Sequence, residues 1–227
     1  MAKWWRKRAL RIYHPNPCES ELRDLDVSRL VADCVLTEAE AIVVSAGGIY
    51  AFYPSQVLYH HVSAVVGERD LVGEIVAEAH TRGLRVIARV DFSKARDDVY
   101  QEHPEWFQIN ADGSPARAGA YYRACPLSGY QREAFALPVL REIQTRYGVD
   151  GYHLNAGGYG GLCYCPTCQE AYAAAHDGAP LPSASADDPA AWQSFMRWRE
   201  EVIGQHLALL YAAMQEQNPQ AFFMAEL

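Results

Sequence analysis

Three cysteines are crowded into six residues of this sequence. Cys163, Cys165 and Cys168 have the spacing C-x-C-x-x-C. A tight turn can bring thiolates spaced in this way within about 4 Å of each other, where they can bind one metal ion. A structural zinc ion takes four ligands, and Cys125 in RACPLS is the candidate for the fourth, since it precedes the neighbouring predicted helix. The alternative is a set of reduced thiols without metal. Because neighbouring thiols oxidise easily unless they are bound, the spacing favours zinc.

Polar side chains follow several of the apolar runs. Asp91 ends the run LRVIARV, and His14 and Asn16 follow an earlier run. A carboxylate at the end of a strand can act as an acid, a base or a hydrogen-bond acceptor. His153 and Asn155 alternate along GYHLN, so their side chains point to the same side of a strand. Each has a structural alternative: Asp91 can cap the turn that follows or pair with Arg89, and the others can order loops or lie in the core.

The elements that must position these residues alternate regularly along the chain. Short apolar runs at 9–13, 41–45, 84–90, 151–155 and 221–225 predict five strands. Helical periodicity lies between them, at 22–35, 70–82, 130–147 and 189–217. Pro138 predicts a kink or a late start in the third of these helices, and Ser128 with Gln131 suggests a capping box. Strict alternation of strand and helix predicts parallel strands joined by helical crossovers.

The length and the net charge of the chain limit the functions that it can have. The 227 residues favour one domain, and the net charge of −8 argues against nucleic acids and anionic membranes, which need basic patches. No run of 18 apolar residues predicts a transmembrane helix. The start MAKWWRKRAL lacks the apolar region of a signal peptide, so we expect a cytoplasmic protein. Of the two remaining cysteines, Cys34 fits a helix face and Cys18 a loop.

Several longer segments span most of the chain: LRIYHPN, AGGIYAFYPS, GEIVAEAHTRGLRVIARVDFSK, HPEWF with ADGSP, CPLSGYQRE, and RYGVDGYHLN before CYCPTC. Together they resemble the hypothetical glycosyl hydrolase 6 family over nearly the whole chain. CPLS and CYCPTC also resemble the segments that supply a four-cysteine structural zinc in glycoside hydrolase family 42 beta-galactosidases. The resemblance implies a (β/α)-barrel of the TIM type that acts on carbohydrates. Such a barrel needs eight strands and about 250 residues, so we expect residues 1–227 to be a single, incomplete barrel domain, its N-terminal portion.

One position departs from the family 42 pattern. In those enzymes the strand before the cysteine cluster ends in an Asn-Glu pair whose Glu is the acid/base. Here Asn155 is followed by Ala156 and Gly157, without a carboxylate. A second family carboxylate belongs to a seventh strand, which the five predicted strands do not reach. Glu226 follows the last predicted strand one residue before the end of the sequence, where chain ends fray, and it is given no role.

With that resemblance, the candidate residues take carbohydrate roles. Asp91 is the expected catalytic carboxylate. The expected sugar contacts, through hydrogen bonds or through aromatic rings that pack on sugar faces, are His14, Asn16, Tyr53, Trp106, His153 and Asn155. A loop Trp such as Trp106 is more often a packing anchor.

The sequence thus predicts a glycoside-hydrolase-like protein that acts on O-glycosidic bonds of an oligosaccharide or polysaccharide. The missing Glu favours one alternative, a non-catalytic carbohydrate-binding pseudoenzyme. Another alternative is a truncated barrel fragment that needs a partner chain. The sugar, the linkage and the oligomeric state, including a homo-oligomer, stay open.

Overall fold

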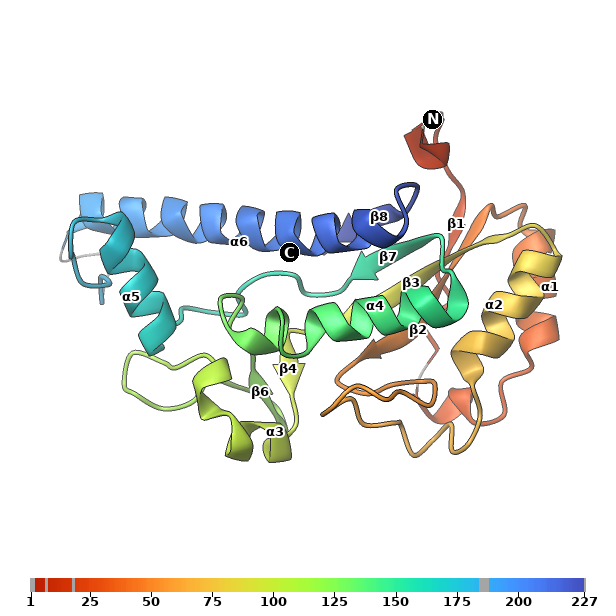
Figure 1. The fold of residues 1–227 in the computed structure, drawn as a ribbon, viewed down its shortest axis with the longest axis horizontal. Helices are drawn as coiled ribbons and strands as arrows, with labels where there is room; N and C mark the ends of the chain where they lie inside the picture. The colour runs from red at the N-terminus through yellow and green to blue at the C-terminus, as the bar shows by residue number, and fades with distance from the viewer. Residues whose placement is uncertain (1–2, 7, 18, 184–187, 227) are drawn as a thin grey trace.

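The main sheet has five strands, and all of them are parallel. The structure is a computed structural model that describes residues 3–6, 8–17, 19–183 and 188–226, so Cys18 lies outside the described residues. The strand order is β1-β2-β3-β7-β8 (Figure 1). These strands are β1 (Ile12–Tyr13), β2 (Ala41–Gly48), β3 (Arg85–Asp91), β7 (Gly151–Leu154) and β8 (Phe222–Ala225). The five predicted strands are therefore confirmed, with shifted ends.

Helices follow the strands as the periodicity predicts. They are α1 (Val27–Leu36), α2 (Leu71–Thr81), α3 (Asp97–Glu102), α4 (Ala136–Tyr147), α5 (Pro166–Ala175) and α6 (Pro189–Gln217). Helix α4 begins only at Ala136, which confirms the late start expected from Pro138. It ends at Gly148 with the left-handed φ of 60° that favours glycine. No helix in the described part of the chain is long and apolar enough to cross a membrane.

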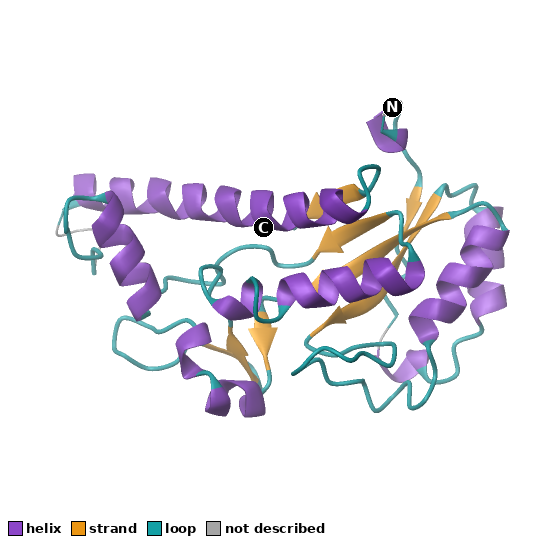
Figure 2. Cartoon of the chain, viewed as in Figure 1, coloured by secondary structure: helices purple, strands orange, loops and turns teal. Residues whose placement is uncertain are grey.

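A small antiparallel sheet follows β3 and was not predicted. It consists of β4 (Lys94–Ala95), β6 (Tyr121–Arg123) and β5 (Arg117–Ala118), in that order (Figure 2). Strands of two or three residues carry no detectable alternation of apolar and polar residues, so the sequence gives no signal for them. This sheet lies at the carboxyl end of β3 and leads into Cys125, so it links the main sheet to the cysteine cluster.

The two faces of the main sheet differ in what covers them. Ile42, Val44, Val86, Ala88 and Tyr152 form a large core with helices α1, α2 and α4. On the opposite side, which we call the inner face, Ala41, Val43 and Ile87 form a separate small cluster with Ile12 and Phe222. Alternation along a strand places Arg89, Asp91, His153 and Asn155 on that same inner face. The inner face is therefore apolar at its base and polar where the strands end.

Helix α6 connects this core to a second one. Its 29 residues span about 43 Å, and its first half extends beyond the main sheet toward α5 (Figure 1). Phe195, Trp198 and Val202 pack with the four cysteines, whereas Leu210, Ala213 and Met214 join the main core. Between the two groups lies His206, which is fully buried and whose ring nitrogens have no hydrogen-bond partner among the described residues. One helix therefore contributes to both cores.

Gly48 fixes the closest backbone approach at the carboxyl end of the sheet. It has a φ of 119°, and a Cβ built on it lies 2.1 Å from the carbonyl oxygen of Asp91. Only glycine fits there, because any side chain would meet the backbone of the neighbouring strand. The end of β2 is thus tied to the position of Asp91.

We expect Gly48→Ala to lower the free energy of unfolding by about 3 kcal/mol or more, since backbone strain and overpacking each cost about 1–3 kcal/mol. Gly83→Ala is the matched control: Gly83 also has a positive φ, 75°, but nothing lies within 4 Å of its built Cβ. Urea denaturation measures both. Equal losses in the two variants would show that the contact with Asp91 does not matter.

Candidate functional site

Three polar residues lie in one row where β3, β7 and β8 end. Val90 pairs with Leu154 and Leu154 pairs with Ala225, so the next residues, Asp91, Asn155 and Glu226, are also level with one another. Backbone hydrogen bonds continue this row, from Asn155 N–H to Val90 O and from Glu226 N–H to Leu154 O, both 2.9 Å. The parallel register, rather than loop packing, brings these side chains together.

Asp91 accepts hydrogen bonds with both carboxylate oxygens. Its Oδ1 accepts from the backbone N–H (2.9 Å) and hydroxyl (2.6 Å) of Ser93, which is the turn cap considered as a structural alternative. Its Oδ2 accepts from Asn155 Nδ2 at 2.9 Å and lies 3.6 Å from Lys94 Nζ. Among the described residues no ion pair joins Asp91 to Arg89. One oxygen therefore shapes the turn, while the other faces the neighbouring strand.

His153 lies in the row below, beside an acidic side chain. It is fully buried, and its Nε2 forms an ion-pair contact of 3.1 Å with Glu226 Oε1. The His14 ring meets the His153 ring edge to face at 5.4 Å between centroids. Burial and the charge of Arg89 lower the pKa of His153, and Glu226 opposes this shift. Burial is the main cause that lowers the pKa of His14, and the charges of His153 and Arg89 lower it further.

A small cavity opens beside this row. Its volume is about 210 Å³, and its lining includes Asn16, Ser45, Tyr50, Arg89 and Asp91. Asn16 reaches it from the segment after β1 with a φ of 44°, a conformation that asparagine tolerates. Ligand sites usually enclose about 300–1,000 Å³, so this cavity can hold only one end of a ligand. The structure therefore brings together five predicted residues: His14, Asn16, Asp91, His153 and Asn155.

Tyr53 and Trp106 lie elsewhere. Tyr53 is fully buried, and its hydroxyl donates to Glu142 Oε2 at 2.7 Å. Trp106 stacks on His103 at 3.8 Å between centroids and packs against Tyr59 and the main core. In this structure Tyr53 lies in the main core, and the partly buried Trp106 packs against that core. An aromatic residue in a predicted loop does not reveal which way its ring points, and the sequence could not distinguish the two roles.

A buried histidine that the sequence did not single out supports the end of β2. His60 Nε2 accepts the N–H of Gly48 at 3.1 Å, and its Nδ1 lies 2.9 Å from Ser55 Oγ, which in turn donates to Glu142 at 2.5 Å. Burial lowers the pKa of His60 to about 4, although the Glu142 carboxylate opposes this shift. A neutral ring is required here, because a protonated Nε2 could not accept from Gly48.

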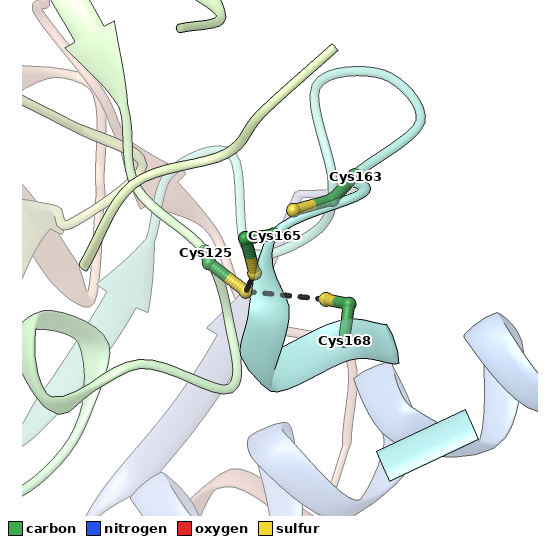
Figure 3. Close-up of side chains that lie close together, drawn as sticks. All are labelled: Cys125, Cys163, Cys165 and Cys168. Carbon is green, nitrogen blue, oxygen red and sulfur yellow. Dashed lines mark hydrogen bonds between the residues drawn. The ribbon is translucent and has the colours of Figure 1, made fainter. Parts of the chain in front are cut away.

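The four predicted cysteines form one buried cluster. Their Sγ atoms all lie within 4.8 Å of one another (Figure 3). Cys125 Sγ is 3.5 Å from Cys168 Sγ and 3.7 Å from Cys165 Sγ. Hydrogen bonds from the neighbouring thiols lower the pKa of Cys165, and the bond from Cys125 has the largest effect. Cys165 also caps α5 and Cys168 lies in its first turn, where the helix dipole favours thiolates. This cluster could hold a metal ion.

The backbone around Cys125 is held by the residues expected to form a capping box. That expectation was wrong, since the residues after Ser128 form a short 3₁₀ helix without a side-chain cap. Instead, Ser128 Oγ donates to Cys125 O at 2.8 Å, and Gln131 Nε2 donates to Ala124 O at 3.1 Å. Gln108 Nε2 donates to the same Ala124 oxygen at 2.8 Å. These side chains present Cys125 to the other three thiols.

We expect the protein to lose stability as the pH falls from about 6.5 to 4. In this range an unfolded histidine binds a proton, whereas buried His60 and His206, both with pKa values lowered to about 4, do not. Each contributes a loss of about 3 kcal/mol, at 1.36 kcal/mol per pH unit. Urea denaturation across this range measures the slope. His60→Asn and His206→Leu should each flatten it, and an unchanged slope in either variant would contradict its assignment.

Comparison with known proteins identifies the fold. Beta-galactosidase BglY from Alicyclobacillus acidocaldarius subsp. acidocaldarius is 36% identical over 107 residues, which are 45% of this chain and 15% of that protein. Alpha-L-fucosidase isoenzyme 2 from Paenibacillus thiaminolyticus superposes with a TM-score of 0.70 at 17% identity, over 95% of this chain and 32% of that one. A beta-galactosidase from Rahnella sp. R3 gives 0.70 at 19% identity, over 95% and 35%.

The likeness to these neighbours and the five-stranded parallel sheet confirm the expected incomplete (β/α)-barrel. The chain spans about a third of each of the two solved structures. They also confirm the resemblance to beta-galactosidases. The model of the family described as hypothetical glycosyl hydrolase 6 matches residues 26–156, which are more than half of the sequence. The chain therefore belongs to the hypothetical glycosyl hydrolase 6 family.

Proposed function

We propose that this protein is a glycoside hydrolase that acts on O-glycosidic bonds of an oligosaccharide or polysaccharide. The observation that carries the proposal is the polar row at the carboxyl ends of parallel strands, where barrel enzymes keep their chemistry. Family membership and the 36% identity to a beta-galactosidase over 107 residues support a β-galactoside as the first substrate to test.

Asp91 is the proposed catalytic carboxylate. Its Oδ2 faces Asn155 at the rim of the 210 Å³ cavity, where a sugar hydroxyl or a water molecule can reach it. His14, Asn16, His153 and Asn155 are the proposed sugar contacts, since they lie on the same edge. Tyr53 and Trp106 are left out of this set because both are packed into aromatic clusters.

A non-catalytic carbohydrate-binding protein is the second candidate. One observation favours it: the residue after Asn155 is Ala156, at the position where family 42 enzymes have a glutamate. Ala156 has a φ of 51°. Such a protein would bind sugars through the same edge without turning them over. The two candidates differ only in turnover, so one experiment separates them.

We expect the protein to hydrolyse 4-nitrophenyl β-D-galactopyranoside or a glycoside of a similar panel, and Asp91→Asn to reduce turnover about 10²–10⁴-fold, as removal of a general acid or base does. Sugar binding, measured by calorimetry, should persist in the variant. Asp112→Asn is the matched control, because Asp112 accepts from Ser114 N–H (2.9 Å) and Ser114 Oγ (2.6 Å) just as Asp91 does from Ser93. Binding without turnover by the wild type would favour the second candidate.

We also propose that the four cysteines hold a structural zinc ion. The chemistry of the donor set fits: four sulfur ligands at about 2.3 Å from zinc lie about 3.8 Å apart in a tetrahedron, close to the two Sγ distances of 3.5 and 3.7 Å. All four side chains are buried, and no disulfide joins cysteines in the described part of the chain. Four sulfur ligands leave no open position for water, so the ion would stabilise the fold.

We expect one zinc ion per chain by native mass spectrometry, and its loss in Cys163→Ser. Loss of the ion should also loosen the second core, where Trp198 packs beside the cysteines, and change the near-ultraviolet circular dichroism. Cys34→Ala is the matched control, because Cys34 is equally buried but belongs to the main core. A wild type that carries no metal after reducing, zinc-replete purification would rule out the site.

We propose further that residues 1–227 form a single domain, the N-terminal portion of a barrel. The open edge of β8 supports this, since its pairing is with β7 alone among the described strands. The proposed partner is a carbohydrate ligand. With a net charge of −8, nucleic acid is not proposed as one.

A further inference from the structure

We infer that Glu226 is a second catalytic carboxylate, opposite Asp91, and that the pair hydrolyses glycosides with inversion of the anomeric centre. This inference rests on the proposed glycosidase function and deepens it. Glu226 is the other carboxylate in the row of residues that follow the strand ends. The strand register places Asp91 beside Asn155 and Asn155 beside Glu226. Glycoside hydrolysis uses two such groups on either side of the scissile bond.

The position of Glu226 is fixed by the sheet. Its N–H donates to Leu154 O at 2.9 Å, and its carbonyl accepts from Gly157 N–H at 2.7 Å. Phe222, which lies four residues before Glu226, packs in the inner-face cluster. Alternation therefore directs Glu226 to the inner face. Its side chain is 59% exposed and lies against the buried His153, so it is open to a ligand yet has a fixed neighbour.

Strand spacing sets the separation of the two carboxylates. Asp91 and Glu226 belong to β3 and β8, with β7 between them, so their Cα atoms are two strand spacings apart, about 9–10 Å. Inverting glycosidases separate their carboxyl groups by about 6.5–9.5 Å, which leaves room for a water molecule, whereas retaining enzymes need about 5–5.5 Å. The Cα separation of these non-adjacent strands thus leaves room for the wider carboxyl separation of an inverting enzyme.

The surroundings assign the two roles. Asp91 accepts from Ser93 and Asn155 and faces Lys94, all of which suit a carboxylate that accepts a proton. Glu226 lies beside His153 Nε2 alone, at 3.1 Å, among the ion-pair partners that the described residues offer it, and we assign it the role of proton donor. In the reaction, the Glu226 carboxyl proton passes to the glycosidic oxygen as the C1–O bond breaks and its electron pair stays on that oxygen. Water attacks C1 from the opposite side and gives its proton to Asp91. The products are the reducing sugar, a hemiacetal at C1, and the alcohol of the leaving group, and proton exchange with solvent returns both carboxyl groups to their starting states.

The test compares variants on 4-nitrophenyl and 2,4-dinitrophenyl glycosides of the sugar that the wild type hydrolyses, and follows the first-formed anomer by NMR. We expect the inverted anomer and a loss of about 10²–10⁴-fold in Glu226→Gln on the 4-nitrophenyl glycoside. The loss should be smaller on the dinitrophenyl glycoside, whose leaving group needs no proton. Asp91→Asn should lose activity on both. Glu105→Gln is the matched control, since Glu105 is 61% exposed and lies 3.0 Å from His103 Nδ1.

Two results would overturn the inference while the proposed function stands. One is a retained anomer from the wild type, and the other is Glu226→Gln within twofold of the wild type on both glycosides. A wild type that hydrolyses no glycoside would instead overturn the proposed function, and the inference with it. The geometry has its own measurement, because a crystal structure with the carboxyl groups closer than about 6 Å contradicts inversion whatever the activity.

Discussion

The parallel register of β3, β7 and β8 is the constraint on which the site depends. A slip of one residue in any of these strands would turn its polar end residue from the inner face to the helix-covered face. The register is held by the pairing of Val90, Leu154 and Ala225 and by the glycine contact at the end of β2. The buried apolar residues between the sheet and α2 and α4 keep it in place, so the core that stabilises the domain also aligns the candidate site.

Much of the fold follows from the sequence because its signals are local. The run AIVVS predicts a strand and the spaced apolar residues of 70–82 predict a helix, each from a few neighbouring residues. Gly148 ends a helix at the position that the sequence predicts. The four cysteines were also predictable, since three of them share one turn and one helix end. Conversely, the short strands at 94–95 and 117–123 carry no periodic signal, and the structure around Ser128 is set by contacts with Cys125.

The candidate site was predictable only in part, because side-chain neighbours across strands depend on register. Sequence position alone placed Asp91 and Asn155 at strand ends, but not the 2.9 Å hydrogen bond between them. The approach of Glu226 to His153 joins residues 73 positions apart, and the buried His60 network joins three separate segments. Tyr53 has the composition of a sugar-binding loop, yet tertiary packing directs it to Glu142. Aromatic residues serve both purposes, and only the fold separates them.

Helix α6 has a mechanical consequence. A continuous 29-residue helix resists bending, and this one starts beside the thiol cluster and ends four residues before β8. It therefore packs against both cores, the one around the four cysteines and the one on the main sheet. The buried side chains on either side of His206 belong to different cores, and one continuous helix carries both sets. We therefore expect the order of the last strand, and of the residue after it, to depend on the packing of the cysteine cluster at the other end of this helix.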